Sequence, residues 1–526
     1  MHKQIDAVLV AHSGSSGVVA KSTSDASFLR RIHLDLTGTV PNPTSTRDFL
    51  ADPSPDKRVK MIDQLLESPQ YARRMQVVFD VMLMERRAST HIKSEEWEDY
   101  LWEAFRNNKS WLQLTNEILT ADGIDERTRP AARFMLDREL NVDDVTRDIG
   151  RMFLGRDLQC AQCHDHPAID DYLQRHYYGI AAFIKRSYVF KDPETKKSSI
   201  GEKAEGDLEF TSVFTAESEK TSPRILDASP INDPTPGPEL YKVKPEKNVR
   251  SVPVYSRRLQ LAKSVTDPGN VSFRYSIANR MWAIMMGRGL VEPVDMWHAT
   301  NPPTHPELIS LLADSLLQQD YDLKYLLREL ALTDAYQRSS QREEKEFDGE
   351  PGNGAGFSVA MMKPLSPEQL AWSMMQVTGV VDQQLNSLIA KQDKKEDDQT
   401  VVDAVWKEKS LNKALRGNVV IFTSVFGTQG VQQARFDASA DQALFLRNGD
   451  LIQRWVALKD GLSDRLAAMD DSDVAQEYYV SVFARMPSTE EAKLIESLLV
   501  ESKDRNADIR QLVWAGLASA EFRFNH

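Results

Sequence analysis

Cysteine is the scarcest residue in this chain, with only two among 526 residues. A disulfide framework is excluded, because two cysteines form at most one bridge. No stretch of 18 or more apolar residues occurs, so no membrane-spanning helix is predicted. Positive charge is also in deficit, with 65 Lys and Arg against 78 Asp and Glu. We therefore expect no nucleic-acid partner, since binding to phosphates needs clustered positive charge.

The familiar nucleotide and hydrolase motifs are missing as well. The sequence has no G-x-S-x-G, P-loop, H-E-x-x-H or dinucleotide fingerprint. No catalytic residue can be assigned from these patterns, and whether the protein is an enzyme stays open.

Most of the chain has the apolar periodicity of amphipathic helices. In the N-terminal part this spacing predicts helices over residues 56–66, 71–86, 95–107, 111–120, 143–154 and 171–184. His305-Pro306-Glu307 predicts another helix start, because proline is tolerated in the first helical turn. Further helices are predicted over residues 441–458, 471–483, 488–501 and 508–519. The fold class is therefore predicted to be mainly α.

Residues 189–254 differ from the rest in composition. They are rich in Lys, Glu, Ser, Thr and Pro, and contain short apolar alternations at residues 208–210 and 211–214. Such a texture favours a loop-rich insert with short strands. We therefore predict two helical domains, over residues 22–188 and 255–526, separated by a short β-containing insert over residues 189–254.

Both cysteines belong to one motif, Cys160-Ala161-Gln162-Cys163-His164. The C-x-x-C-H spacing is that of c-type haem attachment, in which two thiols bind the porphyrin and the histidine ligates iron. The helix predicted at 143–154 runs directly into the motif, which should lie at or just beyond its C-terminus. On this interpretation Cys160 and Cys163 hold haem c, and His164 is an axial ligand.

Other interpretations of the motif remain open. The cysteines could form a redox disulfide, or a zinc or iron site completed by His166 or a distant residue. They could also be a purely structural pair with no cofactor. His166 is interpreted as an alternative metal ligand, or as a residue that hydrogen-bonds to a ligand without touching the metal. Asp165 could orient an imidazole by accepting its second N–H, or be an ordinary loop or cap residue.

The second axial ligand of a haem cannot be identified from the sequence. Each candidate has a simpler interpretation as a structural residue, and Met152 in particular lies in an apolar helical pattern. The candidates are Met152, His33, His176, His298 and His305.

Several blocks resemble a known pair of domains. The sequences SFLRRIHLDLTG at 27–38, CAQCHDHP at 160–167 and YYGIAAF at 177–183 resemble the planctomycete cytochrome-type PSCyt domain. The sequences NPPTHPEL at 301–308, AYQRSS at 335–340 and ALFLRNG at 443–449 resemble its partner PSD domain. The resemblance covers almost the whole chain.

The resemblance implies a location but little about activity. Proteins of this type look extracytoplasmic, and their biochemical activity is largely unassigned. Residues 1–17 contain no apolar segment of the signal-peptide type. We expect a periplasmic or otherwise extracytoplasmic protein that binds c-type haem and has a redox or electron-transfer role. The alternative is a non-haem binding or scaffold protein. Expected partners are a redox protein or a surface polysaccharide system.

Overall fold

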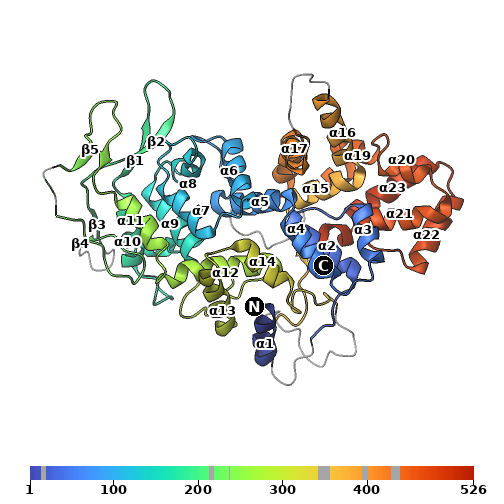
Figure 1. Ribbon diagram of the computed structural model, residues 1–526, viewed down its shortest axis with the longest axis horizontal. Coiled ribbons are helices and arrows are strands. Elements are labelled where there is room, and N and C mark those ends of the chain that lie inside the picture. Colours follow the sequence, from blue (N-terminus) through green and yellow to red (C-terminus); the bar gives the residue numbers. More distant parts are fainter. Residues whose placement is uncertain are drawn as a thin grey trace. The chain divides into compact units, whose positions relative to one another are not determined.

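The computed structural model describes residues 1–13, 19–211, 218–235, 237, 239–341, 356–393, 401–427 and 439–526. Helices dominate these ranges, and the strands that occur form small two-stranded sheets (Figure 1). The predicted mainly α class is confirmed. Part of the predicted insert, residues 212–217, 236 and 238, lies outside the described residues.

The chain folds into two compact units that are not continuous in sequence. The first unit comprises Met1–Ser15 and Val78–Leu330, and the second comprises Ser16–Val77 and Ala331–His526. Of the three boundaries, one follows Ser15, one falls inside helix α5 (Pro69–Met84) and one falls inside α14 (Leu323–Ala331). The domain boundaries predicted at residues 188 and 254 were drawn from sequence composition, whereas the two units are defined by contacts between residues. The predicted boundaries therefore stay a prediction.

The first unit contains an N-terminal helix, a central helical group and the strands of the insert. Its remaining helices are α1 (His2–Ser13), α6 (Ser94–Arg106), α7 (Trp111–Thr120), η1 (Arg129–Ala132), α8 (Arg133–Leu136), α9 (Val142–Leu154), η2 (Gln159–Gln162), α10 (Gln174–Ile184), α11 (Arg257–Val265), α12 (Val271–Met286) and α13 (Pro306–Gln318). Sequence reasoning had not predicted α1. The helix start predicted at His305 is confirmed, with Pro306 in the first turn of α13.

The core of the first unit is built around α9, which contacts both α10 and α12. Trp111 stacks on Phe153 with ring centroids 5.7 Å apart, and on Phe273 at 6.1 Å. All three rings are buried. Burying a large aromatic side chain stabilises the folded state by roughly 1.5–3 kcal/mol, so this cluster fixes α7, α9 and α12 to one another.

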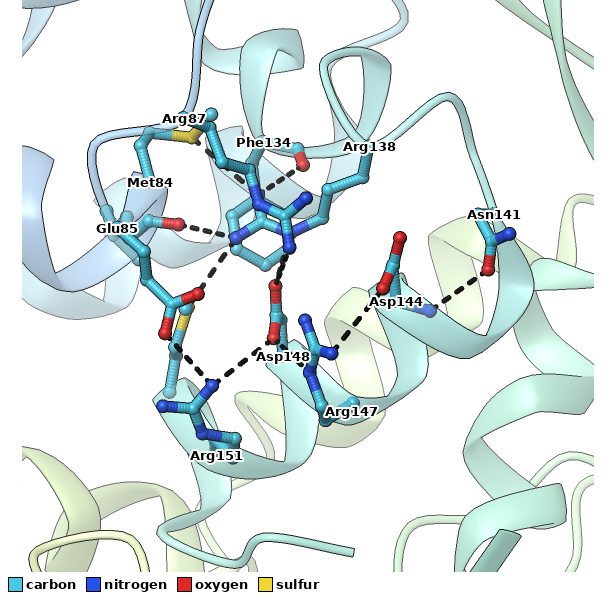
Figure 2. A network of polar contacts seen from close by, with 12 residues as sticks. Met84, Glu85, Arg87, Phe134, Arg138, Asn141, Asp144, Arg147, Asp148 and Arg151 are labelled. Carbon is cyan, nitrogen blue, oxygen red and sulfur yellow. Dashed lines mark hydrogen bonds and ion pairs between the residues drawn. The ribbon is translucent and has the colours of Figure 1, made fainter. Parts of the chain in front are cut away.

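A buried ionic network holds α9 from its other side. Arg138 donates to Asp148 over 2.6 Å, and both side chains are fully buried. Figure 2 shows Arg138 also directed at Phe134, whose carbonyl it binds at 2.7 Å and whose ring it covers at 4.1 Å. Burial alone would raise the pKa of Asp148, but the guanidinium groups of Arg138 and Arg147 hold it below its ordinary value. Asp148 therefore stays ionised within the core.

The strands of the insert form hairpin-like pairs. They are β1 (Ser187–Lys191) with β2 (Ser198–Glu202), β3 (Leu208–Thr211) with β4 (Ser218–Thr221), and β5 (Tyr241–Val243) with β6 (Val252–Pro253). Tyr188 lies opposite Gly201 in the first pair. A Cβ at Gly201 would collide with the Tyr188 ring, so the aromatic ring occupies the space that a side chain would need.

The second unit is helical and includes one short sheet. Its elements are α2 (Asp25–Thr37), α3 (Pro43–Ala51), α4 (Lys57–Leu66), β7 (Lys363–Pro364), α15 (Pro367–Thr378), α16 (Val380–Gln392), α17 (Ala404–Phe426), α18 (Ala440–Asn448), α19 (Asp450–Val456), α20 (Leu462–Ala467), α21 (Asp471–Phe483), α22 (Thr489–Val500), α23 (Arg505–Ala518), α24 (Ala520–Arg523) and β8 (Phe524–Asn525). The single helix predicted over 441–458 is wrong, because Gly449 has an extended backbone and separates α18 from α19.

The core of the second unit joins segments from both ends of its sequence. Leu34 of α2 belongs to the same buried cluster as Met374 of α15 and Leu411 of α17. Phe422 stacks on Trp455 at 5.6 Å. Strand β7 pairs antiparallel with β8, with Lys363 opposite Asn525. This unit therefore depends on contacts between residues far apart in the chain.

Candidate functional site: the Cys160–His166 loop

The loop that carries the motif begins where α9 ends. Gly155 caps the helix in the left-handed conformation, with φ of +66°, which glycine adopts without steric cost. The next residues are held by the segment around Asp295, because the Asp157 N–H donates to the Asp295 carbonyl at 2.8 Å and the Trp297 N–H donates to the Gly155 carbonyl at 3.1 Å. The predicted position of the motif, just beyond a helix C-terminus, is confirmed.

Both cysteines of the motif are exposed and unbridged. Buried Leu158 and Ala161 anchor the loop to the body of the unit. Two of its carbonyls are bound by α10: Gln174 Nε2 donates to the Cys163 carbonyl at 3.0 Å, and the Tyr178 hydroxyl donates to the Gln162 carbonyl at 2.9 Å. The main chain of the loop is thus held in place by side chains of α10.

The side chain of Tyr178 is half-buried where it binds the loop. Burial raises the pKa of Tyr178, and the charges of Asp143 and Cys163 raise it further. The Tyr178 ring stacks on Phe210 at 4.5 Å. Sequence reasoning did not place Gln174 or Tyr178 at the site. Their helical spacing of four residues, shortly after the motif, is the signal that would have put them on one face of α10.

The main chain orients the imidazole of His164. Its Nδ1 lies 2.7 Å from the Asp165 carbonyl. A carbonyl only accepts hydrogen bonds, so Nδ1 carries the proton and the lone pair of the neutral ring is on Nε2. The carboxylate of Asp165 does not bind the imidazole. Its Oδ1 accepts a hydrogen bond from the Gln174 N–H, over 2.7 Å, at the start of α10. The backbone of Asp165, rather than its side chain, therefore meets the imidazole, and the cap interpretation of the side chain fits the structure.

His166 belongs to a second aromatic group beside the loop. Its Nδ1 accepts the Ala168 N–H at 3.1 Å, and its ring lies 6.1 Å from that of Tyr172. Tyr172 in turn packs edge-on against His298 at 5.6 Å. Burial lowers the pKa of His298; the Asp171 carboxylate opposes that shift, and His166 adds to it. The structure thus brings His166 and His298 together through Tyr172, which sequence reasoning missed.

The other proposed second ligands lie in distinct surroundings. Met152 is buried in α9, with its sulfur 4.0 Å from Arg138 Nη2. His176 Nε2 binds Asp227 at 2.8 Å, and its Nδ1 accepts the Leu173 N–H at 3.4 Å. His305 precedes α13, with its ring 4.4 Å from that of His12. His33 belongs to the second unit.

The described residues contain neither a ready-made metal site nor a membrane-spanning helix. Within those ranges no group of three or more His, Cys, Asp or Glu side chains is arranged to hold a metal ion. None of the helices described there is long and apolar enough to cross a membrane.

Comparison with known proteins assigns both halves of the chain. Residues 4–188 match the family PSCyt2, described as a protein of unknown function (DUF1549). Residues 257–499 match PSD1, likewise a protein of unknown function (DUF1553). The chain is a PSCyt2 domain followed by a PSD1 domain. The order agrees with the resemblance seen in the sequence. No curated protein and no solved structure is significantly similar to it.

Proposed function

We propose that this PSCyt2–PSD1 protein binds c-type haem outside the cytoplasm and has a redox or electron-transfer role. The observation that supports it best is the combination of two exposed thiols with an oriented imidazole. An imidazole that ligates a metal usually donates its other N–H to a carbonyl or carboxylate. The His164 ring has this arrangement through Nδ1, which leaves Nε2 as the basic nitrogen.

The residues of the loop fit covalent attachment of haem. Attachment needs thiols that are free and accessible, and Cys160 and Cys163 are unbridged and exposed. It also needs a main chain that holds the two side chains outward. Gln174 and Tyr178 bind the loop through backbone carbonyls, so neither thiol nor the imidazole of His164 makes these contacts.

The chain's own residues divide the work around such a group. Cys160 and Cys163 would hold the porphyrin, and His164 the iron. Haem bound there would supply one-electron transfer, or binding of a small molecule where iron has an open position. His166 lies in the loop itself, and its ring is linked to that of His298 through Tyr172. A redox protein or a surface polysaccharide system remains the proposed partner.

The proposal is tested by making the protein in a periplasm that contains haem lyase. We expect a Soret band and a pyridine haemochrome spectrum of the two-thioether type, with haem retained on a denaturing gel. Cys160→Ala with Cys163→Ala should abolish retention. His164→Ala should change the spectrum, and His166→Ala serves as the matched control that keeps covalent attachment.

A colourless protein from the same cells would contradict the proposal. The non-haem alternative then gains support, with the pair as a disulfide or as part of a zinc or iron site. Thiol titration and elemental analysis of the same preparation separate those two cases, because a disulfide removes the reactive thiols and a metal appears in stoichiometric amount.

A further inference from the structure

A small pocket in the second unit is lined mainly by polar and charged side chains. The residues around it include Thr37, Arg73, Arg74, Glu368, Gln369 and Trp372. Its enclosed part is no larger than a water molecule or a single small atom group. Most of the wall is rigid, since the side chains of Arg73, Gln369 and Trp372 are buried and held by other contacts.

Arg73 has several polar partners within this wall. Its Nε binds Glu408 at 2.5 Å, and its Nη2 binds the Thr37 carbonyl at 3.2 Å and Thr39 Oγ1 at 3.0 Å. The guanidinium lies 3.9 Å from the centre of the Trp372 ring. Arg73 therefore has its counter-charge and its orientation without a ligand.

Arg74 is different. Its Nε is buried and has no hydrogen-bond partner among the described residues. No ion pair within 4 Å involves it in that part of the chain, although it is affected by the charges of Asp35 and Glu368. Asp35 is already bound to Lys363 at 2.6 Å, to the Tyr336 hydroxyl at 2.8 Å and to Asn525 at 2.8 Å. A buried guanidinium with an unmade hydrogen bond is costly, and such groups normally have a partner.

Charged side chains of both signs surround Arg74. Arg31, Arg73 and Lys363 are cationic, and Asp35, Glu368 and Glu408 are carboxylates. Arg31 donates to the backbone carbonyls of Tyr336 and Arg338. Arg74 differs from Arg73 in that its Nε has no hydrogen-bond partner among the described residues.

We propose that this pocket binds one oxyanion, a carboxylate or a sulfate group, with its leading oxygen bound by Arg74. One oxygen fills the enclosed part, and the rest of the group stays at the mouth. A guanidinium fork binds such groups with charge-assisted hydrogen bonds. A free anion and an acidic group on a glycan present the same chemistry to the pocket.

The test measures sulfate and acetate binding to the full chain by isothermal titration calorimetry, in a chloride buffer of constant ionic strength. We expect saturable binding to the unaltered protein. Arg74→Gln should raise the dissociation constant roughly tenfold or more. Arg74→Lys keeps the positive charge but lacks the guanidinium fork, so its dissociation constant should lie between those of the unaltered protein and Arg74→Gln. Arg510→Gln, at an exposed arginine of α23, is the matched control and should bind as the unaltered protein does.

A second readout guards against a variant that folds poorly. Sulfate raises the melting temperature of most proteins without saturation, because it is excluded from their surfaces. Binding at a site adds a saturable rise in melting temperature. We expect the Arg74→Gln variant to lack this saturable rise and the Arg510→Gln variant to retain it. A sulfated disaccharide that binds more tightly than inorganic sulfate indicates a glycan source, and equal binding indicates a free anion. Equal sulfate responses in all variants, or equal binding of an uncharged disaccharide, would overturn the proposal.

Discussion

Two polar regions, one within helix α9 and one beyond its C-terminus, differ in how they are held. In the middle of the helix, Asp148 is fully buried and shared among guanidinium groups, each bond running from side chain to side chain. Beyond its C-terminus, the Cys160–His166 loop is held through its carbonyls, with the two thiols exposed. The first region fixes the helix, and the second leaves its reactive side chains available.

The difference shows where changes to this protein should affect stability and where they should affect chemistry. Burying charges requires that every partner be present, because an unpaired charge in the core is strongly unfavourable. A loop fixed by its main chain has no such dependence on its side chains. Four predictions test this contrast, in order of expected effect.

The largest effect is expected for Asp148→Ala. The change leaves Arg138 buried with its neighbour Phe134 but without a carboxylate, and should cost about 3–5 kcal/mol in the free energy of unfolding. Urea denaturation followed by circular dichroism measures it. The double change Arg138→Met with Asp148→Leu should be milder than Asp148→Ala alone. An equal or larger loss in the double variant would show that packing, not charge, dominates this site.

The half-buried His33 of the second unit gives a prediction about pH. Burial lowers the pKa of His33 to about 4, from an ordinary value of 6.5. The unfolded chain therefore takes up a proton before the folded protein does. The stability present above pH 6.5 is lost as the pH falls through 4, by about 2 kcal/mol, a figure reduced from that of the full pKa shift because the residue is only half-buried. Unfolding free energies between pH 7 and 4 test this, and His33→Phe should flatten that slope.

One side chain of the loop should matter for stability. Asp165 accepts the Gln174 N–H at the start of α10, so Asp165→Ala should cost about 1 kcal/mol, the usual effect of losing a helix cap. Asp165→Asn keeps an acceptor and is the control. Thermal unfolding of both variants measures the difference. Similar losses for Ala and Asn would indicate that the negative charge matters rather than the hydrogen bond.

The smallest effect is expected at the cysteines. In protein made without haem, Cys160→Ser with Cys163→Ser should change the free energy of unfolding by less than about 0.5 kcal/mol, as for most exposed positions. Chemical denaturation under reducing conditions measures this. A loss above about 1 kcal/mol would contradict the division drawn here, and would favour a structural role for the pair.

Periodicity predicted most of the helices because their apolar residues repeat every three or four positions. Residues 111–120 and 471–483 were predicted with their observed bounds. Helix α17 was missed, since its buried side chains, such as Leu411, Leu415 and Phe422, are few for its length. The break at Gly449 was missed although Asn448-Gly449-Asp450 is a turn-like sequence.

The candidate site was predictable only in part. The motif and its place after α9 follow from local sequence, since Gly155 comes directly after the last apolar residue of the helix. The contacts of its histidines do not, because His164 meets a backbone carbonyl and His166 approaches His298 through Tyr172. Such neighbours depend on tertiary packing, which no spacing rule specifies.

The composition of the second unit has a consequence for biosynthesis. Ser16–Val77 leave the ribosome early, yet the segment that completes their unit begins only at Ala331. Until then the apolar faces of α2 and α4 have no native core to enter, and contacts closed over so long a loop form slowly. The larger part of the first unit, Val78–Leu330, is synthesised in that interval. A gene cut at residue 254 would therefore separate an early segment from the residues on which its folding depends.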